Sequence, residues 1–126
     1  MTVSAGTPLV SVIDDDESVR ESLPDLLKQF GFAVDTFSSA EEFLVSLSRG
    51  ETRCLLLDIA LPGMTGLDLQ QELRRRQPET PIIFITADRD EALRQRVLAA
   101  GAVECLFKPF TDIALLGALN AALGRT

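Results

Sequence analysis

A run of acidic residues directly follows a short apolar segment near the N-terminus. The apolar segment covers residues 9–13, and the acids are Asp14, Asp15, Asp16 and Glu17. Carboxylates within roughly 4–6 Å raise one another's pKa, so such a cluster is stable when it is solvated or when a cation neutralises it. Taken alone, the run is also typical of a helix start, where acids interact favourably with the helix dipole. It therefore indicates either a cation site or a helix N-terminus.

Three further polar residues stand in comparable positions. Asp58, Thr86 and Lys108 each come directly after a short, mainly apolar segment. If these segments are parallel strands, their carboxyl ends share one edge of the sheet, and ligands of open α/β sheets bind at that edge. Taken singly, Thr86 would be a strand-end cap and Lys108 a solvated charge. Together with the first acids, the four polar strand ends indicate one common site.

The segments that would position these residues alternate between strand and helix patterns. Strands are predicted at residues 9–13, 33–36, 53–58, 82–85 and 103–107. A first helix is predicted from an N-cap at Asp16 to a stop at Gly31. A second begins with a capping box at Ser39–Glu42 and ends at Gly50, and a third begins with a capping box at Thr65–Asp68. Two more are predicted over residues 91–100 and 111–123. This (βα)5 pattern predicts an α/β fold of the doubly wound class, with a five-stranded parallel sheet and right-handed crossovers.

Composition narrows the classes of function. A chain of 126 residues predicts one domain, with residues 1–8 as a loose tail. The net charge of −7 argues against nucleic-acid binding, which needs Lys and Arg, and the absence of histidine excludes histidine-based metal sites. Cys54 and Cys105 fall in predicted strands, which favours a reducing compartment. No signal peptide and no membrane-spanning run is recognised, so a cytoplasmic location is expected.

As a set, these motifs resemble the receiver domain of two-component response regulators. Thr86 lies 28 positions after Asp58 and Lys108 lies 50 after it, as that family requires. The segments at 57–66 and 99–103 are similar to the family as well. The resemblance extends from residue 9 to residue 123. The local sequence around the motifs is most similar to that of the nitrogen-fixation-type regulators, which carry a C-terminal helix-turn-helix output domain. It implies a flavodoxin-like three-layer sandwich with strand order 2-1-3-4-5 and a receiver domain over residues 9–126.

The resemblance also implies a magnesium site. Asp58 matches the phosphoacceptor, and counting back from Arg20 makes Asp14 and Asp15 the acid pair of the family. Asp15 and Asp58 would bind Mg²⁺ through their side chains and Ala60 through its backbone carbonyl, while Asp14 would bind through water. Asp16 is then an additional acid, interpreted as a helix cap.

Further roles follow from the same resemblance. Lys108 would supply a cation to the phosphoryl oxygens, and the Thr86 hydroxyl would donate a hydrogen bond to one of them. The Lys108–Pro109 peptide is expected to be cis, which would turn the lysine back toward Asp58. Cys105 occupies a position that is usually aromatic in the family and takes part in switching, so switching through Thr86 and its loop is expected instead.

The implied function is a signalling module and not an enzyme, apart from its own phosphorylation and dephosphorylation. A sensor histidine kinase would be its partner, and phosphorylation would favour a homodimer through the fourth helix, fifth strand and fifth helix. Transcription would be regulated by an output domain outside this chain, without direct nucleic-acid contact by this one. Two alternatives remain: a stand-alone regulator, and a phosphohydrolase acting through an aspartyl-phosphate. A flavin or nucleotide binder is disfavoured, because the chain has neither a glycine-rich loop after the first strand nor Trp or Tyr.

Overall fold

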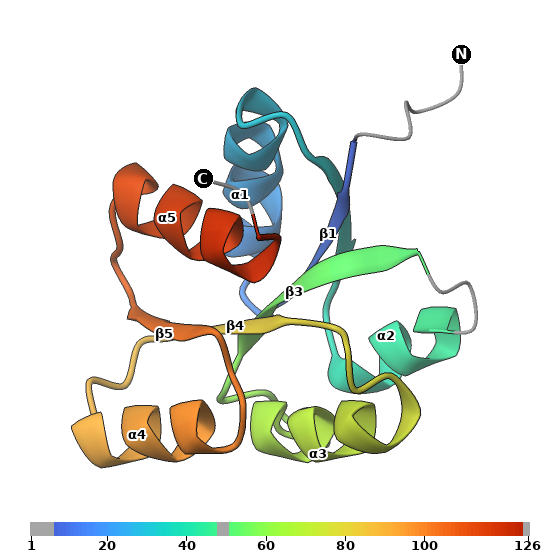
Figure 1. The fold of residues 1–126 in the computed structure, drawn as a ribbon, viewed down its shortest axis with the longest axis vertical. Coiled ribbons are helices and arrows are strands. Elements are labelled where there is room, and N and C mark those ends of the chain that lie inside the picture. Colours follow the sequence, from blue (N-terminus) through green and yellow to red (C-terminus); the bar gives the residue numbers. More distant parts are fainter. Residues whose placement is uncertain (1–6, 48–50, 125–126) are drawn as a thin grey trace.

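The computed structural model describes residues 7–47 and 51–124, in which five strands alternate with five helices (Figure 1). The strands are β1 (Leu9–Ile13), β2 (Ala33–Phe37), β3 (Thr52–Asp58), β4 (Ile82–Thr86) and β5 (Glu104–Phe107). The helices are α1 (Glu17–Gln29), α2 (Ala40–Ser46), α3 (Gly66–Arg76), α4 (Glu91–Ala99) and α5 (Asp112–Ala122). Most of the predicted tail, residues 1–6, and the predicted helix stop at Gly50 lie outside the described residues.

All pairings in the sheet are parallel, and the strand order is β2-β1-β3-β4-β5, as expected. The register decides which residues meet at the carboxyl edge. Ile13 of β1 pairs with Leu57 of β3, so the residues that follow them, Asp14 and Asp58, become neighbours. Asp58 in turn pairs with Ile85, the residue before Thr86.

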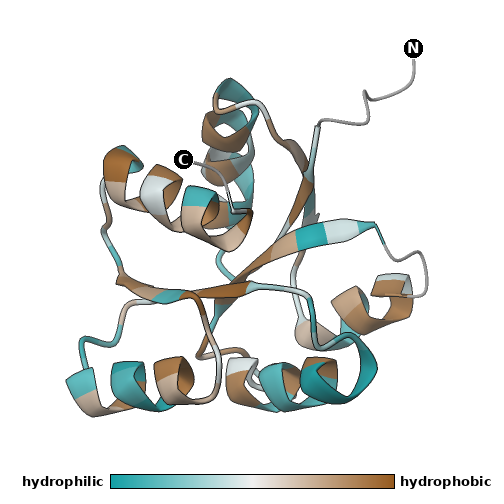
Figure 2. Cartoon of the chain, viewed as in Figure 1, coloured by the Kyte–Doolittle hydropathy of each residue, from teal (hydrophilic) through white to brown (hydrophobic). Residues whose placement is uncertain are grey.

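Helices cover both faces of the sheet, which gives the predicted three layers. In Figure 1, α1 and α5 lie on one face and α2, α3 and α4 on the other. Each interface has its own core: Leu27 and Leu115 pack against one face, and Phe43, Leu69 and Val97 against the other. The buried residues of the helices are mainly apolar, for example Leu23 and Leu27 of α1. Figure 2 shows such hydrophobic segments in brown beside hydrophilic ones in teal on α3 and α4. Because β3 and β4 are covered on both faces, the buried residues that precede their polar ends, 54–57 in β3 and 82–85 in β4, are all apolar.

The structure departs from the sequence-based expectation at a few ends. The capping box of α3 is complete, but that of α2 is half formed. Ser39 accepts a hydrogen bond from the Glu42 backbone, whereas the Glu42 carboxylate accepts one from the Ser38 hydroxyl and not from the Ser39 backbone. Several strand and helix limits shift by one residue, which is the usual scatter at element ends. α1 continues through Pro24. The Lys108–Pro109 peptide is cis, as predicted.

Candidate functional site

The carboxyl edge of the sheet gathers three carboxylates. One oxygen from each of Asp14, Asp15 and Asp58 lies within 4.8 Å of the other two. Asp14 is 0% exposed and Asp58 is 5% exposed, while Asp15 faces solvent. Burying two carboxylates side by side is costly unless a cation balances them. The donor set contains oxygen alone, which is the chemistry that hard divalent cations prefer.

A lysine from the far end of the sequence reaches into this cluster. Lys108 Nζ donates a hydrogen bond to Asp14 Oδ2 at 2.8 Å and lies 3.8 Å from Asp58 Oδ2. Lys108 follows Phe107 at the end of β5, and β3 and β4 separate β5 from β1 in the sheet. The lysine side chain therefore extends along the carboxyl edge of the sheet to reach Asp14. The described residues therefore place one cation against two buried acids, and the acids remain in excess.

Burial and the neighbouring charges together perturb the acid–base behaviour of Asp58. Burial, together with the charge of Asp14, raises the pKa of Asp58 from its ordinary 3.8 to about 6, although Lys108 opposes the shift. Burial alone would lower the pKa of Lys108, but its hydrogen bond to Asp14 and the charges of both acids outweigh burial and raise it. Lys108 is therefore a permanent cation at neutral pH, and Asp58 is an acid whose ionised form the site disfavours.

Thr86 lies at the end of β4 and is 2% exposed. Its hydroxyl oxygen accepts a hydrogen bond from the Asp88 backbone at 3.0 Å, which leaves the hydroxyl proton to be donated elsewhere. Its carbonyl accepts a hydrogen bond from the Lys108 backbone at 2.7 Å. The residue thus connects the loop before α4 with the loop before α5.

The loop after β1 is fixed by its own side chains. Asp16 is the N-cap of α1, as interpreted from the sequence, and its carboxylate accepts from the Ser18 backbone. Asp14 Oδ1 accepts from the Asp16 backbone at 2.9 Å. Arg20, which the sequence analysis used only to align the acid pair with the family, donates a hydrogen bond from Nη1 to the Asp14 carbonyl at 2.8 Å. No sequence signal indicated this contact, because it depends on how α1 docks after the turn.

The loop after β3 carries Ala60, the residue predicted to offer a backbone ligand. The Ala60 backbone donates to Asp58 Oδ1 at 3.2 Å, so the loop already contacts the predicted phosphoacceptor. Glu41 of α2 reaches the same loop and accepts from the Met64 backbone at 3.0 Å. Glu41 was predicted only as part of a helix cap, since a contact across 23 positions leaves no local pattern.

Both cysteines are buried, as their places in predicted strands suggested. Cys105 packs in the core beneath α4, and burial raises the pKa of its thiol. Burial raises the pKa of Cys54 to about 12. Thiols held in the protonated form are poor nucleophiles, so both side chains act as small apolar core residues.

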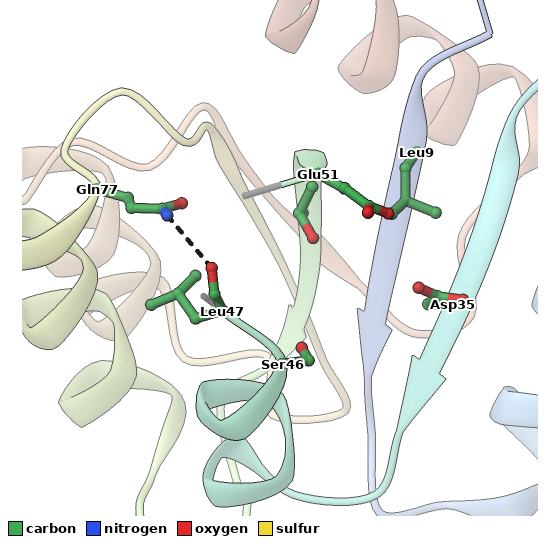
Figure 3. A pocket seen from close by; sticks show the side chains of 7 residues that line it. Leu9, Asp35, Ser46, Leu47, Glu51 and Gln77 are labelled. Atoms are coloured by element: carbon green, nitrogen blue, oxygen red, sulfur yellow. Dashed lines mark hydrogen bonds between the residues drawn. The ribbon is translucent and has the colours of Figure 1, made fainter. Parts of the chain in front are cut away.

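A small hollow lies at the opposite, amino-terminal edge of the sheet. Figure 3 shows the residues that line it, among them Leu9, Asp35 and Glu51, with the hydrogen bond from Gln77 to the Leu47 carbonyl alongside. Its volume of about 10 Å³ is room for roughly one water molecule, so it has no space for a substrate. In residues 7–47 and 51–124, no helix is long and apolar enough to cross a membrane.

Comparisons with known proteins agree with this geometry. A family model described as "Response regulator receiver domain" matches residues 10–120. Nodulation protein W of Bradyrhizobium diazoefficiens is 44% identical over 98% of this chain and 55% of its own length. Transcriptional regulatory protein FixJ of Azorhizobium caulinodans is 42% identical over 93% of this chain and 56% of its own.

Solved structures give the same result. A response regulator receiver domain protein from Clostridium thermocellum superposes with a TM-score of 0.87 at 28% identity, covering 93% of this chain and 94% of that one. The chain spans only about half the length of the curated relatives it matches.

Proposed function

The chain belongs to the response regulator receiver domain family, and on that premise we propose that Asp58 accepts a phosphoryl group from a sensor histidine kinase. The observation that best supports this assignment is the setting of Asp58, a buried carboxylate beside two other acids and 3.8 Å from a lysine amine. A carboxylate is a competent nucleophile toward phosphorus, and charged neighbours can stabilise the group that it receives.

In the proposed transfer, a carboxylate oxygen of Asp58 forms a bond to phosphorus while the nitrogen–phosphorus bond of the kinase phosphohistidine breaks. The imidazole nitrogen leaves with the bonding electron pair and takes up a proton from solvent. The products are an acyl phosphate on Asp58 and a neutral histidine on the kinase. Phosphoryl transfer depends mainly on positioning and on stabilising charge, so the surrounding residues matter more than acid–base chemistry.

The acid cluster fits Mg²⁺, which prefers oxygen ligands and keeps several waters. We assign Asp15 and Asp58 as side-chain ligands, the Ala60 carbonyl as a third ligand, and Asp14 as a ligand through water. When bound, the ion supplies positive charge to the carboxylates and to the phosphoryl oxygens. Histidine is absent from the chain, so a competing site of imidazole ligands cannot form.

Lys108 and Thr86 are proposed to hold the phosphoryl group once it has arrived. Lys108 Nζ, now bonded to Asp14 at 2.8 Å, is close enough to Asp58 to donate to a phosphoryl oxygen after a small movement. The Thr86 hydroxyl proton, which the contact with Asp88 leaves free, would donate to another. Each is a charge-assisted hydrogen bond worth roughly 1.5–3 kcal/mol.

The output of the domain is proposed to pass through the face of α4, β5 and α5. The Thr86 carbonyl accepts a hydrogen bond from the Lys108 backbone, and this contact connects the two loops that would sense the phosphoryl group. Arg94 of α4 donates to the Glu104 carboxylate and to the Cys105 carbonyl, which connects α4 to β5. A displacement of either loop would therefore be transmitted to this face.

We expect phosphorylation to favour a homodimer through that face. Two or three new contacts of roughly 1.5–3 kcal/mol approach the roughly 5.5 kcal/mol that a switch from 1:99 to 99:1 requires. Because Cys105 replaces the usual aromatic residue, we expect a smaller population shift than is usual in the family. Sedimentation velocity with and without beryllofluoride, a phosphoryl mimic, measures it. An unchanged monomer, with amide shifts confined to the surroundings of Asp58, would contradict this route.

The complete protein is proposed to regulate transcription in the cytoplasm. The relatives named above are about twice as long as this chain, and one is called a transcriptional regulatory protein. An output domain would then make the DNA contacts, because a receiver with a net charge of −7 is poorly suited to them. A stand-alone regulator remains the alternative, and the length of the full reading frame distinguishes the two.

The proposal is tested by incubating the protein with acetyl phosphate and Mg²⁺ and following both its mass and the phosphate released. A receiver should take up one phosphoryl group per chain, and should release phosphate slowly from a generic phosphate ester. Rapid, continuous turnover of p-nitrophenyl phosphate would favour the phosphohydrolase alternative. A chain that neither gains mass nor releases phosphate from any phosphodonor would contradict both.

A further inference from the structure

The loop that follows the phosphoacceptor is held from outside by a glutamate on another helix. We infer that Glu41 is a positioning residue for the phosphorylation site, whose carboxylate fixes the loop that presents the Ala60 carbonyl. This inference rests on the function proposed above and names a residue of the site that the strand-end pattern does not include.

The contact between Glu41 and the loop is close on two sides. Glu41 Oε2 accepts a hydrogen bond from the Met64 backbone at 3.0 Å. The same oxygen lies against Gly63, where an added Cβ would be only 2.6 Å away from it. Gly63 also has a φ of +72°, a backbone conformation that glycine adopts without strain. The positive φ favours glycine at this position. A larger residue would in addition force the Glu41 carboxylate away from the turn.

The two ends of this loop are fixed by the fold itself. At the start, Ile59 is buried and its carbonyl accepts a hydrogen bond from the Gly66 backbone at 3.0 Å. At the end, Gly66 packs so closely that a Cβ there would lie 2.6 Å from the Asp58 carbonyl. These contacts anchor the base of the loop beside the site.

The turn itself, residues 62–64, is held less firmly than its base, although Met64 packs partly against the core. Pro62 and Gly63 are exposed, and Met64 is half-buried. Within the part of the chain that the structure describes, Glu41 makes the one side-chain hydrogen bond to this turn. Glu41 and the turn come together because α2 and α3 cover the same face of the sheet (Figure 1). Removing the carboxylate would loosen the turn while leaving its base in place.

The charge state of Glu41 agrees with this role. The hydrogen bond from the Met64 backbone lowers the pKa of the Glu41 carboxyl below its ordinary value. The ionised form therefore makes the contact, and charge-assisted hydrogen bonds to backbone N–H groups are stronger than neutral ones. Residues that orient metal ligands typically change metal affinity by roughly 10–100-fold when they are mutated. Glu41 acts through the backbone of the loop and not on a ligand side chain, so the lower end of that range is expected.

The neighbouring Glu42 provides a matched control. Both glutamates are exposed and lie in the first turn of α2, so both interact with its N-terminus in the same way. The Glu42 carboxylate accepts a hydrogen bond from the Ser38 hydroxyl and makes none with the loop. Any loss shared by Glu41→Ala and Glu42→Ala would therefore report on α2, and a loss confined to Glu41→Ala would report on the loop.

The experiment compares Glu41→Ala, Glu41→Gln and Glu42→Ala by titration calorimetry with Mg²⁺ and by amide hydrogen exchange at Met64 without metal. Glu41→Ala should weaken Mg²⁺ binding about tenfold and lose protection at Met64, and saturating Mg²⁺ should restore phosphorylation by acetyl phosphate. Glu41→Gln keeps an acceptor oxygen but loses the charge, so it should lose only part of the effect, whereas Glu42→Ala should stay close to wild type.

Two outcomes separate this inference from the proposed function. If wild type binds Mg²⁺ and becomes phosphorylated while Glu41→Ala and Glu42→Ala bind the ion equally well, Glu41 has no positioning role and the function stands. If wild type neither binds Mg²⁺ nor accepts a phosphoryl group, the function fails, and loss of protection at Met64 in Glu41→Ala still decides whether the glutamate holds the loop.

Discussion

Replacing Asp58 with asparagine should make the metal-free protein more stable at pH 7, by as much as about 3 kcal/mol. Burial and the charge of Asp14 raise the pKa of Asp58 from 3.8 to about 6, so its ionised form is disfavoured in the folded state. A carboxyl whose pKa is higher by one in the folded chain than in the unfolded chain destabilises the fold by about 1.4 kcal/mol once it is ionised. Because Asp58 titrates together with Asp14 and Lys108, about 3 kcal/mol is the upper end of the gain.

The sign of the pH dependence follows from the direction in which the pKa moves. A raised pKa means that, between about pH 4 and about pH 6, the folded chain keeps a proton on Asp58 that the unfolded chain has lost. Stability contributed by this group therefore falls as pH rises through that window, and is constant above it. Asp58→Asn has no such group, so the two proteins should be equally stable near pH 4 and diverge toward pH 7.

Urea denaturation in EDTA across this pH range measures the difference. Asp25→Asn is a suitable control, because Asp25 is exposed on α1 and its replacement should change stability by no more than about 0.5 kcal/mol. Equal stability of wild type and Asp58→Asn at pH 7 would mean that the acid edge does not repel Asp58, and the electrostatic description of the site would be wrong.

Millimolar Mg²⁺ should raise the stability of the wild-type protein markedly. Ligand that binds only the folded state adds about 2.7 kcal/mol at a concentration one hundred times its dissociation constant. The carboxylates of Asp14, Asp15 and Asp58 provide the site, and neutralising their repulsion is the physical source of the gain. Asp15→Asn removes a proposed direct ligand without disturbing a buried group, so it should lose most of the effect.

Asp16 supplies the control for this measurement. It is adjacent in sequence but serves as the N-cap of α1, a position that asparagine fills almost as well. Asp16→Asn should therefore keep the Mg²⁺-dependent rise in melting temperature. If Mg²⁺ leaves the melting temperature of wild type unchanged, or if both variants respond alike, the ion does not bind where we assign it.

Much of the fold and of the site could be predicted because their signals are local. The apolar runs of residues 54–57 in β3 and 82–85 in β4 lead directly to Asp58 and Thr86, and β1, apolar except for Ser11, is followed directly by Asp14. The parallel register then brings Asp14 beside Asp58. Asp16 and Thr65 were recognised as helix caps from residues within three positions of them.

Contacts between distant elements could not be predicted in the same way. The bond from Lys108 to Asp14 joins residues 94 positions apart, and the bond between Glu41 and Met64 depends on how α2 packs beside the loop. At the start of α2, the sequence predicted a reciprocal capping box, but the nearby Ser38 hydroxyl bonds to Glu42 instead. Periodicity does not encode such choices, because they depend on which polar groups the folded chain brings within reach of one another.

The central claim is that the phosphoryl group is carried by Asp58. The most direct measurement treats the protein with acetyl phosphate and Mg²⁺, reduces the acyl phosphate with borohydride, and maps the converted residue by peptide mass spectrometry. Conversion should be found at residue 58 alone and should be absent from Asp58→Asn treated in the same way. Conversion at Asp14 or Asp15 in the wild type, or undiminished uptake of phosphoryl by Asp58→Asn, would contradict this assignment.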